Sequence, residues 1–242
     1  MTIYTLLTIA HAGFGTLALF TFWTAGMARK GSPLHVRAGK LYLLSMVALL
    51  VLAVPMSLMI IARGGPGIAI GCFLLYLLVI TTTSTWLSWR AIRDKRDWAR
   101  YTGPVHRGLM WLNLASGLGV AMVGLFLADR MQLIMVSFSL IGIMTFVRMR
   151  RFAAQPPAEA RWWMRQHLRA MLGNGVATHI AFLSIGLPKL LPWLQGPLFQ
   201  NMAWIGPLGV SALAGAYLTR KYLRGPVSAA ALSGSSYPAS TQ

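Results

Sequence analysis

The chain has 242 residues, of which 56% are hydrophobic and only 11% are charged. Soluble globular domains carry about 25% charged residues, so this composition excludes an ordinary water-soluble enzyme. The formal net charge of +18 would indicate a nucleic-acid partner in a soluble protein. In so apolar a chain it indicates a membrane protein with basic loops, and we expect no nucleic-acid partner.

Seven segments are long and apolar enough to cross about 30 Å of hydrocarbon. In chain order they lie near residues 3–27, 41–62, 67–89, 107–127, 131–147, 170–187 and 202–219. The sequence therefore predicts an all-α polytopic membrane bundle of seven transmembrane helices, built as a single transmembrane domain over residues 1–224. Residues 225–242 are small and polar, which predicts a disordered cytoplasmic tail.

The basic residues are distributed unevenly between the two sides of the predicted bundle. The loops after the first, third and fifth spans, together with the tail, hold 19 of the 22 Lys and Arg residues, and the other loops hold 3. Because Lys and Arg are retained on the cytoplasmic side, the N-terminus is predicted outside and the C-terminus inside. A cytoplasmic face this basic should attract the bilayer's anionic lipids.

A short pattern recurs where the even-numbered spans begin. In Ser32-Pro33-Leu34-His35 and in Gly103-Pro104-Val105-His106 the first residue can cap a helix and proline suits its first position. His106 and His167 are each followed by Met at +4 and Asn at +7. We interpret the pattern as three hairpin repeats plus a seventh helix; the alternative is that these residues merely cap surface helices.

The histidines are the main candidates for chemistry, because the predicted membrane midplane contains no carboxylate. His11 and His179 are expected at matching depths near the outer surface, and His106 and His167 at matching depths near the inner one. Paired imidazoles from two helices are what haem b requires, so these layers predict a redox protein that exchanges electrons with quinone. Against this, twelve residues place His167 and His179 about 120° apart around their helix.

Three other hypotheses about function are alternatives to haem binding. His35, His106 and His167 could together ligate a transition metal. Alternatively, the protein is a small permease with a polar substrate path made of Thr82, Thr85, Asn113 and Asn174, or a non-catalytic subunit that binds anionic lipid or a partner protein. In the last two cases the histidines only form hydrogen bonds between helices and no cofactor is bound.

Several of these motifs also carry a resemblance. The segments His11-Ala12-Gly13 and His35-x-Arg37-x-Gly39-Lys40-x-Tyr42, with the later His106-Arg107 and His167-x-x-x-Met171, resemble an uncharacterised family of bacterial predicted membrane proteins of unknown function. The resemblance covers most of the chain up to the seventh span. It implies a multi-pass protein of the bacterial inner membrane and no established activity. The layered histidines are also similar, more faintly, to those of di-haem membrane cytochromes.

Overall fold

The computed structural model describes residues 1–128, 131–194 and 196–223, and the predicted tail lies outside them. Its elements are α1 (Ile3–Met27), α2 (Pro33–Ile61), α3 (Pro66–Arg93), α4 (Trp98–Tyr101), α5 (Pro104–Leu127), α6 (Gln132–Ala154), α7 (Trp162–Ala181), a π-helical turn (Phe182–Gly186), α8 (Leu187–Leu190) and α9 (Pro197–Leu223). The described residues contain no strand. Seven helices are long and apolar enough to cross a membrane, counting α7 with the turn and α8 as one.

The predicted helices all exist, and most extend beyond their apolar cores. α2 starts at Pro33, eight residues before the predicted span, because the Ser32 hydroxyl accepts a hydrogen bond from the His35 amide (3.3 Å). α5 starts at Pro104 after Gly103, as the pattern predicts. α6 continues to Ala154 instead of ending at residue 147. Hydropathy locates the apolar stretch, whereas caps and charged last turns locate the helix ends.

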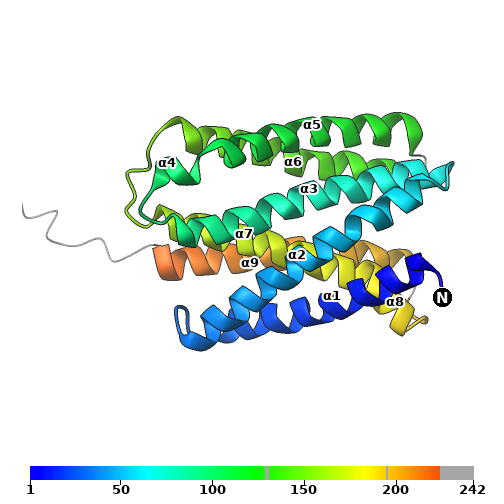
Figure 1. The fold of residues 1–242 in the computed structure, drawn as a ribbon, viewed down its shortest axis with the longest axis horizontal. Helices are drawn as coiled ribbons and strands as arrows, with labels where there is room; N and C mark the ends of the chain where they lie inside the picture. Colours follow the sequence, from blue (N-terminus) through cyan, green and yellow to red (C-terminus); the bar gives the residue numbers. More distant parts are fainter. Residues whose placement is uncertain (129–130, 195, 224–242) are drawn as a thin grey trace, which may run out of the picture.

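The long helices lie side by side, with α5 and α6 along one edge of the bundle and α1 along the opposite edge (Figure 1). α3 is central and packs against α2, α5 and α7, while α9 packs against α7. Two of the predicted hairpins, α1–α2 and α3–α5, are packed pairs. The third is not: α6 packs on α5, and α7 packs on α3 and α9.

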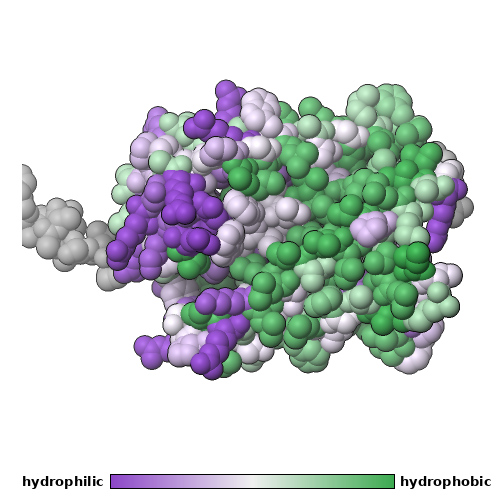
Figure 2. Space-filling model, in the orientation of Figure 1, coloured by the Kyte–Doolittle hydropathy of each residue, from purple (hydrophilic) through white to green (hydrophobic). Residues whose placement is uncertain are grey.

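The structure places most of the described basic residues at one end of the bundle, here named the basic end. α1, α3, α6 and α9 finish there, and α2, α5 and α7 begin there. Figure 2 shows hydrophilic residues over this end and hydrophobic ones over the middle of the molecule. Large apolar side chains such as Leu44, Val51, Phe126 and Leu213 are exposed along the helices. A surface of this kind is suited to contact with lipid chains.

Apolar packing and hydrogen bonds between side chains and backbone groups hold the helices together. The largest core cluster joins Phe73 and Tyr76 of α3 to Val120 of α5 and to Met135 and Phe138 of α6. The Tyr76 hydroxyl donates to the Phe138 carbonyl (2.6 Å) and accepts from the Gly142 amide (2.9 Å). It therefore contacts the two backbone groups that an α-helix normally joins to each other. This contact fixes α6 against α3 in the middle of the bundle.

Candidate functional sites at the basic end

His179 contacts α1, and both of its ring nitrogens have partners. Its Nδ1–H donates to the Gly175 carbonyl (2.7 Å), and its Nε2 accepts from the Trp23 indole N–H (3.0 Å). The Phe22 and Trp23 rings meet it edge-on. Trp23 lies twelve residues beyond His11, which is about 18 Å along α1. The structure therefore places His179 against a different part of α1 from the predicted outer partner, His11.

His11 is partly exposed, and its Nδ1 is buried without a hydrogen-bond partner in the part of the chain that the structure describes. It lies on α1, the helix that pairs with α2. The nearby Gly15 packs toward Leu49 of α2. His11 thus belongs to the α1–α2 pair, with the Leu49 backbone of α2 close to its ring.

His35 and His167 lie in one neighbourhood at the basic end. His35 Nδ1–H donates to the Ala25 carbonyl (2.9 Å) at the end of α1, and His167 Nδ1–H donates to the Ser88 carbonyl (2.9 Å) of α3. His35 and Lys30 are close enough to His167 for their charges to act on it. A histidine whose Nδ1–H is held by a carbonyl presents the lone pair of its Nε2, as ligating histidines do.

The Lys30 side chain caps the C-terminal end of α1. Its ammonium group donates to the Gly26 carbonyl (2.5 Å) and to the Ala25 carbonyl (3.1 Å), which His35 also contacts. Carbonyls in the last turn of a helix lack partners within the helix itself. Burial lowers the pKa of Lys30, and the charge of Lys221 on α9 lowers it further. The loop between α1 and α2 therefore brings together the Lys30 ammonium group and the His35 ring, which contact the same Ala25 carbonyl.

His106 lies on the other side of α3 from His167. Only 2% of it is exposed, its ring packs near Tyr101 with centroids 5.6 Å apart, and it lines a cavity together with Trp86 and Arg90. Trp86 and Arg90 are each two residues from Ser88, so they lie about 160° from it around α3. The predicted inner pair, His106 and His167, is therefore separated by α3.

The predicted metal and haem ligands are thus divided among several places. The described ranges contain no group of three or more His, Cys, Asp or Glu side chains arranged to hold a metal ion. The structure does not bring His35, His106 and His167 together, since His106 is on the far side of α3. His35 and His167 do lie close to each other.

The predicted polar path is divided by α3 in the same way. Asn113 of α5 donates to the Thr83 hydroxyl (2.7 Å), and Thr85 donates to Asn174 of α7 (3.2 Å). Thr83 and Thr85 lie about 160° apart around α3, so the two asparagines occupy opposite sides of it. The hydroxyl that meets Asn113 belongs to Thr83, the neighbour of Thr82 in the same run of hydroxyl residues. These contacts join helices, and they do not line one continuous path.

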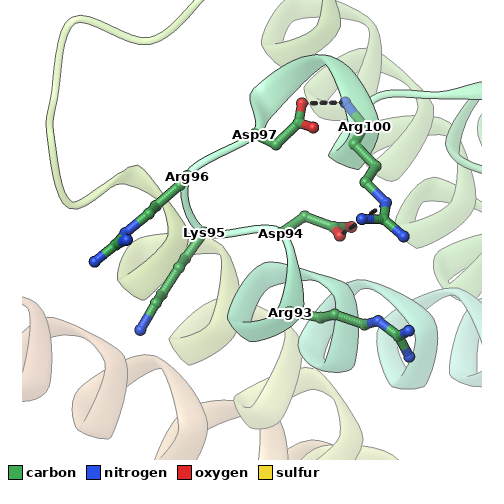
Figure 3. A pocket seen from close by; sticks show the side chains of 6 residues that line it. All are labelled: Arg93, Asp94, Lys95, Arg96, Asp97 and Arg100. Carbon is green, nitrogen blue, oxygen red and sulfur yellow. Dashed lines mark hydrogen bonds and ion pairs between the residues drawn. The ribbon is translucent and has the colours of Figure 1, made fainter.

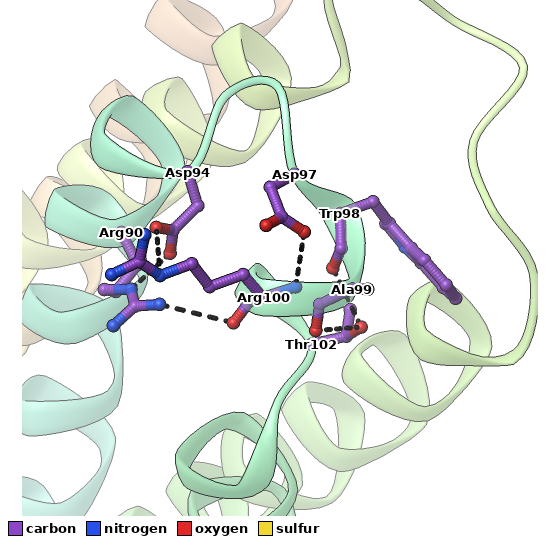
Figure 4. A network of polar contacts seen from close by, with 7 residues as sticks. All are labelled: Arg90, Asp94, Asp97, Trp98, Ala99, Arg100 and Thr102. Atoms are coloured by element: carbon purple, nitrogen blue, oxygen red, sulfur yellow. Dashed lines mark hydrogen bonds and ion pairs between the residues drawn. The ribbon is translucent and has the colours of Figure 1, made fainter.

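The turn between α3 and α4 forms a basic cavity of about 310 Å³, named here the α3–α4 bowl (Figure 3). It is lined by Arg93, Asp94, Lys95, Arg96, Asp97 and Arg100. Both carboxylates, those of Asp94 and Asp97, have partners within the turn. Asp94 pairs with Arg90 and, at 3.6 Å, with Arg100, while Asp97 accepts from the Arg100 amide at 2.8 Å and caps α4 (Figure 4).

Three cations of the bowl are left without a carboxylate partner among the described residues: Arg93, Lys95 and Arg96. All three are exposed. Arg93 lies over the Trp89 ring (5.2 Å) and Lys95 near the Trp163 ring (5.9 Å). Tryptophan prefers the membrane–water boundary, so the bowl combines free positive charge with the side chains of that depth.

A second cavity, of about 260 Å³, lies between α3, α4 and the start of α5. We name it the His106 cavity. Tyr101 Oη and His106 Nδ1 are buried there without a hydrogen-bond partner among the described residues. Burial raises the pKa of Tyr101, and the nearby Asp94 charge raises it further, against the opposing effect of Arg148. Tyr101 therefore keeps its proton at neutral pH and can donate a hydrogen bond.

Of the residues that line the His106 cavity, the sequence predicted only His106 as a site residue. In the neighbouring α3–α4 bowl, Asp94 lies in the turn between two helices, yet its side chain is fully buried. Its position four residues after Arg90 is the spacing of a helical ion pair and was the available signal. Tyr101 has no comparable signal, because α4 is a single short turn that only the folded chain places beside His106.

The fold and its basic end together define a class, the multi-pass helical membrane protein, with seven helices able to cross a bilayer. Comparison with known proteins adds no narrower assignment. No family model matches the chain, no curated protein matches it, and no solved structure matches it.

Proposed function

We propose that this protein binds the phosphate headgroups of anionic lipid at its basic end, with the α3–α4 bowl as the main site. The observation that carries the proposal is that the bowl's two carboxylates are committed internally, which leaves Arg93, Lys95 and Arg96 free. Each basic residue near an anionic surface contributes about 1 kcal/mol of attraction. In this proposal the basic end faces the cytoplasm of a bacterial inner membrane, following the positive-inside rule.

Replacing Arg93, Lys95 and Arg96 together with glutamine should weaken binding of phosphatidylglycerol or cardiolipin about a hundredfold. The estimate follows from three contributions of about 1 kcal/mol each. The measurement is lipid retention by native mass spectrometry of the purified full chain, titrated with each lipid against phosphatidylcholine.

The matched control removes the same charge elsewhere at the basic end. Arg150, Arg151 and Arg161 are also exposed, and their triple glutamine variant should retain most of the binding. Equal losses in the two triple variants would show diffuse attraction without a site in the bowl. Equal retention of phosphatidylcholine by the unaltered protein would contradict the whole proposal.

A second candidate function is a histidine-ligated redox cofactor, haem or a transition metal. The observation that favours it is that His35 and His167 both give their Nδ1–H to backbone carbonyls, which leaves each Nε2 available. The support for His179 as an axial ligand is weaker, because its Nε2 already accepts from Trp23. The ligand pair that we favour is therefore His35 with His167, in place of His106 with His167.

Changing either His35 or His167 to glutamine should abolish the cofactor's absorption band or its metal content, because neither residue can substitute for the other. Changing His179 to glutamine should leave both signals unchanged. The protein is purified from haem-replete cells and measured by absorption and elemental analysis. A colourless, metal-free protein that also fails to bind added haem, zinc or copper would remove this candidate.

A further inference from the structure

The His106 cavity is bounded by residues of α3, α4 and α5. Its lining differs chemically from that of the α3–α4 bowl. Its wall includes Trp86 and Arg90 of α3, Tyr101 of α4, and Pro104, Val105 and His106 of α5. Pro104 and Val105 are exposed at the first turn of a membrane-spanning helix. The cavity therefore has an apolar edge where lipid chains begin and a polar interior behind it.

The interior contains hydrogen-bonding groups that the protein itself does not satisfy. Tyr101 and His106 are each 2% exposed, and both Tyr101 Oη and His106 Nδ1 lack a partner among the described residues. Buried polar atoms are almost always paired, because leaving one unpaired costs the full desolvation of that group. Two such atoms on residues lining one cavity indicate that a ligand with acceptor atoms belongs there.

The two arginines that line the cavity share one carboxylate. Arg90 pairs with the buried carboxylate of Asp94 and donates to the Arg100 carbonyl (3.3 Å). The guanidinium of Arg90 also lies over the Trp86 ring, 5.3 Å from its centroid. Arg100 contacts the same carboxylate at 3.6 Å. The groups left without a partner are a phenol and an imidazole, both of which can donate to carbonyl oxygens.

The size of the cavity limits its occupant to the head of a larger molecule. Pockets that enclose a drug-sized ligand have volumes of about 300–1,000 Å³, and this cavity is smaller, at about 260 Å³. A single ring with carbonyl oxygens fits this limit, with an apolar tail leaving past Pro104 and Val105 into the bilayer.

We propose that the His106 cavity binds the head of a lipid-soluble quinone, with Tyr101 Oη–H and His106 Nδ1–H donating to its carbonyl oxygens. Trp86 supplies a flat apolar wall for the ring, and Val105 lies at the exit of the tail. The site involves no covalent step, and it does not depend on lipid binding in the bowl, whose three free cations are different residues.

The test is a titration of the purified full chain in phosphatidylcholine nanodiscs with decylubiquinone, followed by calorimetry. Saturable binding is expected. Decanoate, which has the same tail length and a carboxylate head, should bind at least tenfold more weakly. Tighter binding of decanoate would overturn the quinone assignment and identify a fatty-acid site.

Two variants separate this binding from a merely structural role. Tyr101→Phe removes only the unpartnered hydroxyl, so the unliganded protein should keep its thermal stability while quinone affinity falls about 3- to 10-fold, the value of one hydrogen bond. Val105→Trp should block the cavity and abolish binding. Val105 is about half exposed, so the larger side chain can be accommodated in the folded protein.

The repeated helix start supplies a matched control. Leu34 occupies in α2 the position that Val105 occupies in α5, directly after the first-turn proline, and it is similarly exposed. Leu34→Trp should leave quinone binding unchanged. Unchanged affinity in Val105→Trp, or equal losses in the two tryptophan variants, would overturn the proposal, as would the absence of saturable binding in the unaltered protein.

Discussion

Replacing Asp94 with asparagine should lower the free energy of unfolding by about 3–5 kcal/mol, the usual cost of breaking a buried ion pair from one side. The Asp94 side chain is fully buried, and Arg90, its partner four residues earlier, is 17% exposed. Removing the negative charge leaves the Arg90 guanidinium desolvated beside an amide. The thermal midpoint of the detergent-solubilised protein should fall by about 6 °C or more, at about 2 °C per kcal/mol.

Asp97 provides the control for this experiment, because it lies in the same turn but is exposed. It caps α4 through the Arg100 amide, and Asp97→Asn keeps a capping oxygen there. Asparagine and aspartate are about equally good caps, so the midpoint should shift little. Equal shifts in the two variants would mean that Asp94 contributes no more than an ordinary surface carboxylate.

Replacing Gly142 with leucine should prevent the bundle from assembling. A Cβ atom at Gly142 would lie 2.7 Å from the Asn113 carbonyl of α5 and 2.9 Å from the Tyr76 hydroxyl of α3. Real Cβ atoms do not approach other atoms this closely, so α6 would have to move away from both helices. Overpacking a well-packed core costs about 1–3 kcal/mol for smaller insertions, and here three helices meet at backbone distance.

The measurement is the yield of monodisperse protein by size-exclusion chromatography in mild detergent. Gly142→Ala should already reduce the yield, and Gly142→Leu should reduce it to background. Gly119→Ala is the matched control, because Gly119 lies in the middle of α5 with open space around its Cβ position. A normal yield for Gly142→Leu would show that α6 is not fixed against α3 and α5.

The number and order of the spanning helices could be predicted from the sequence, because apolar length alone determines which segments can cross a bilayer. The helix starts at Pro33 and Pro104 could be predicted as well, since capping is local. The end of α6 could not. Arg148, Arg150 and Arg151 interrupt the apolar run, but they continue the helix into the basic end.

The pairing of side chains between helices was the part that sequence could not supply. Matching depths predicted His11 beside His179, and α7 does contact α1, but at a different depth. His179 instead meets Trp23, and a helix in the centre of the bundle, α3, separates His106 from His167. Depth is a one-dimensional quantity, whereas a ligand pair requires the packing order of the helices around one another.

The concentration of cations at one end of the bundle also changes the solution next to it. A surface that carries so many Lys and Arg residues repels hydrogen ions, so the pH in the adjoining water layer is higher than in the bulk. The layer is about one Debye length thick, which is about 8 Å at physiological ionic strength. Lys30, whose pKa is already lowered by burial and by Lys221, lies inside it. Added salt compresses this layer and brings its pH back toward the bulk value, so protonation at this end of the protein depends on ionic strength as well as on pH.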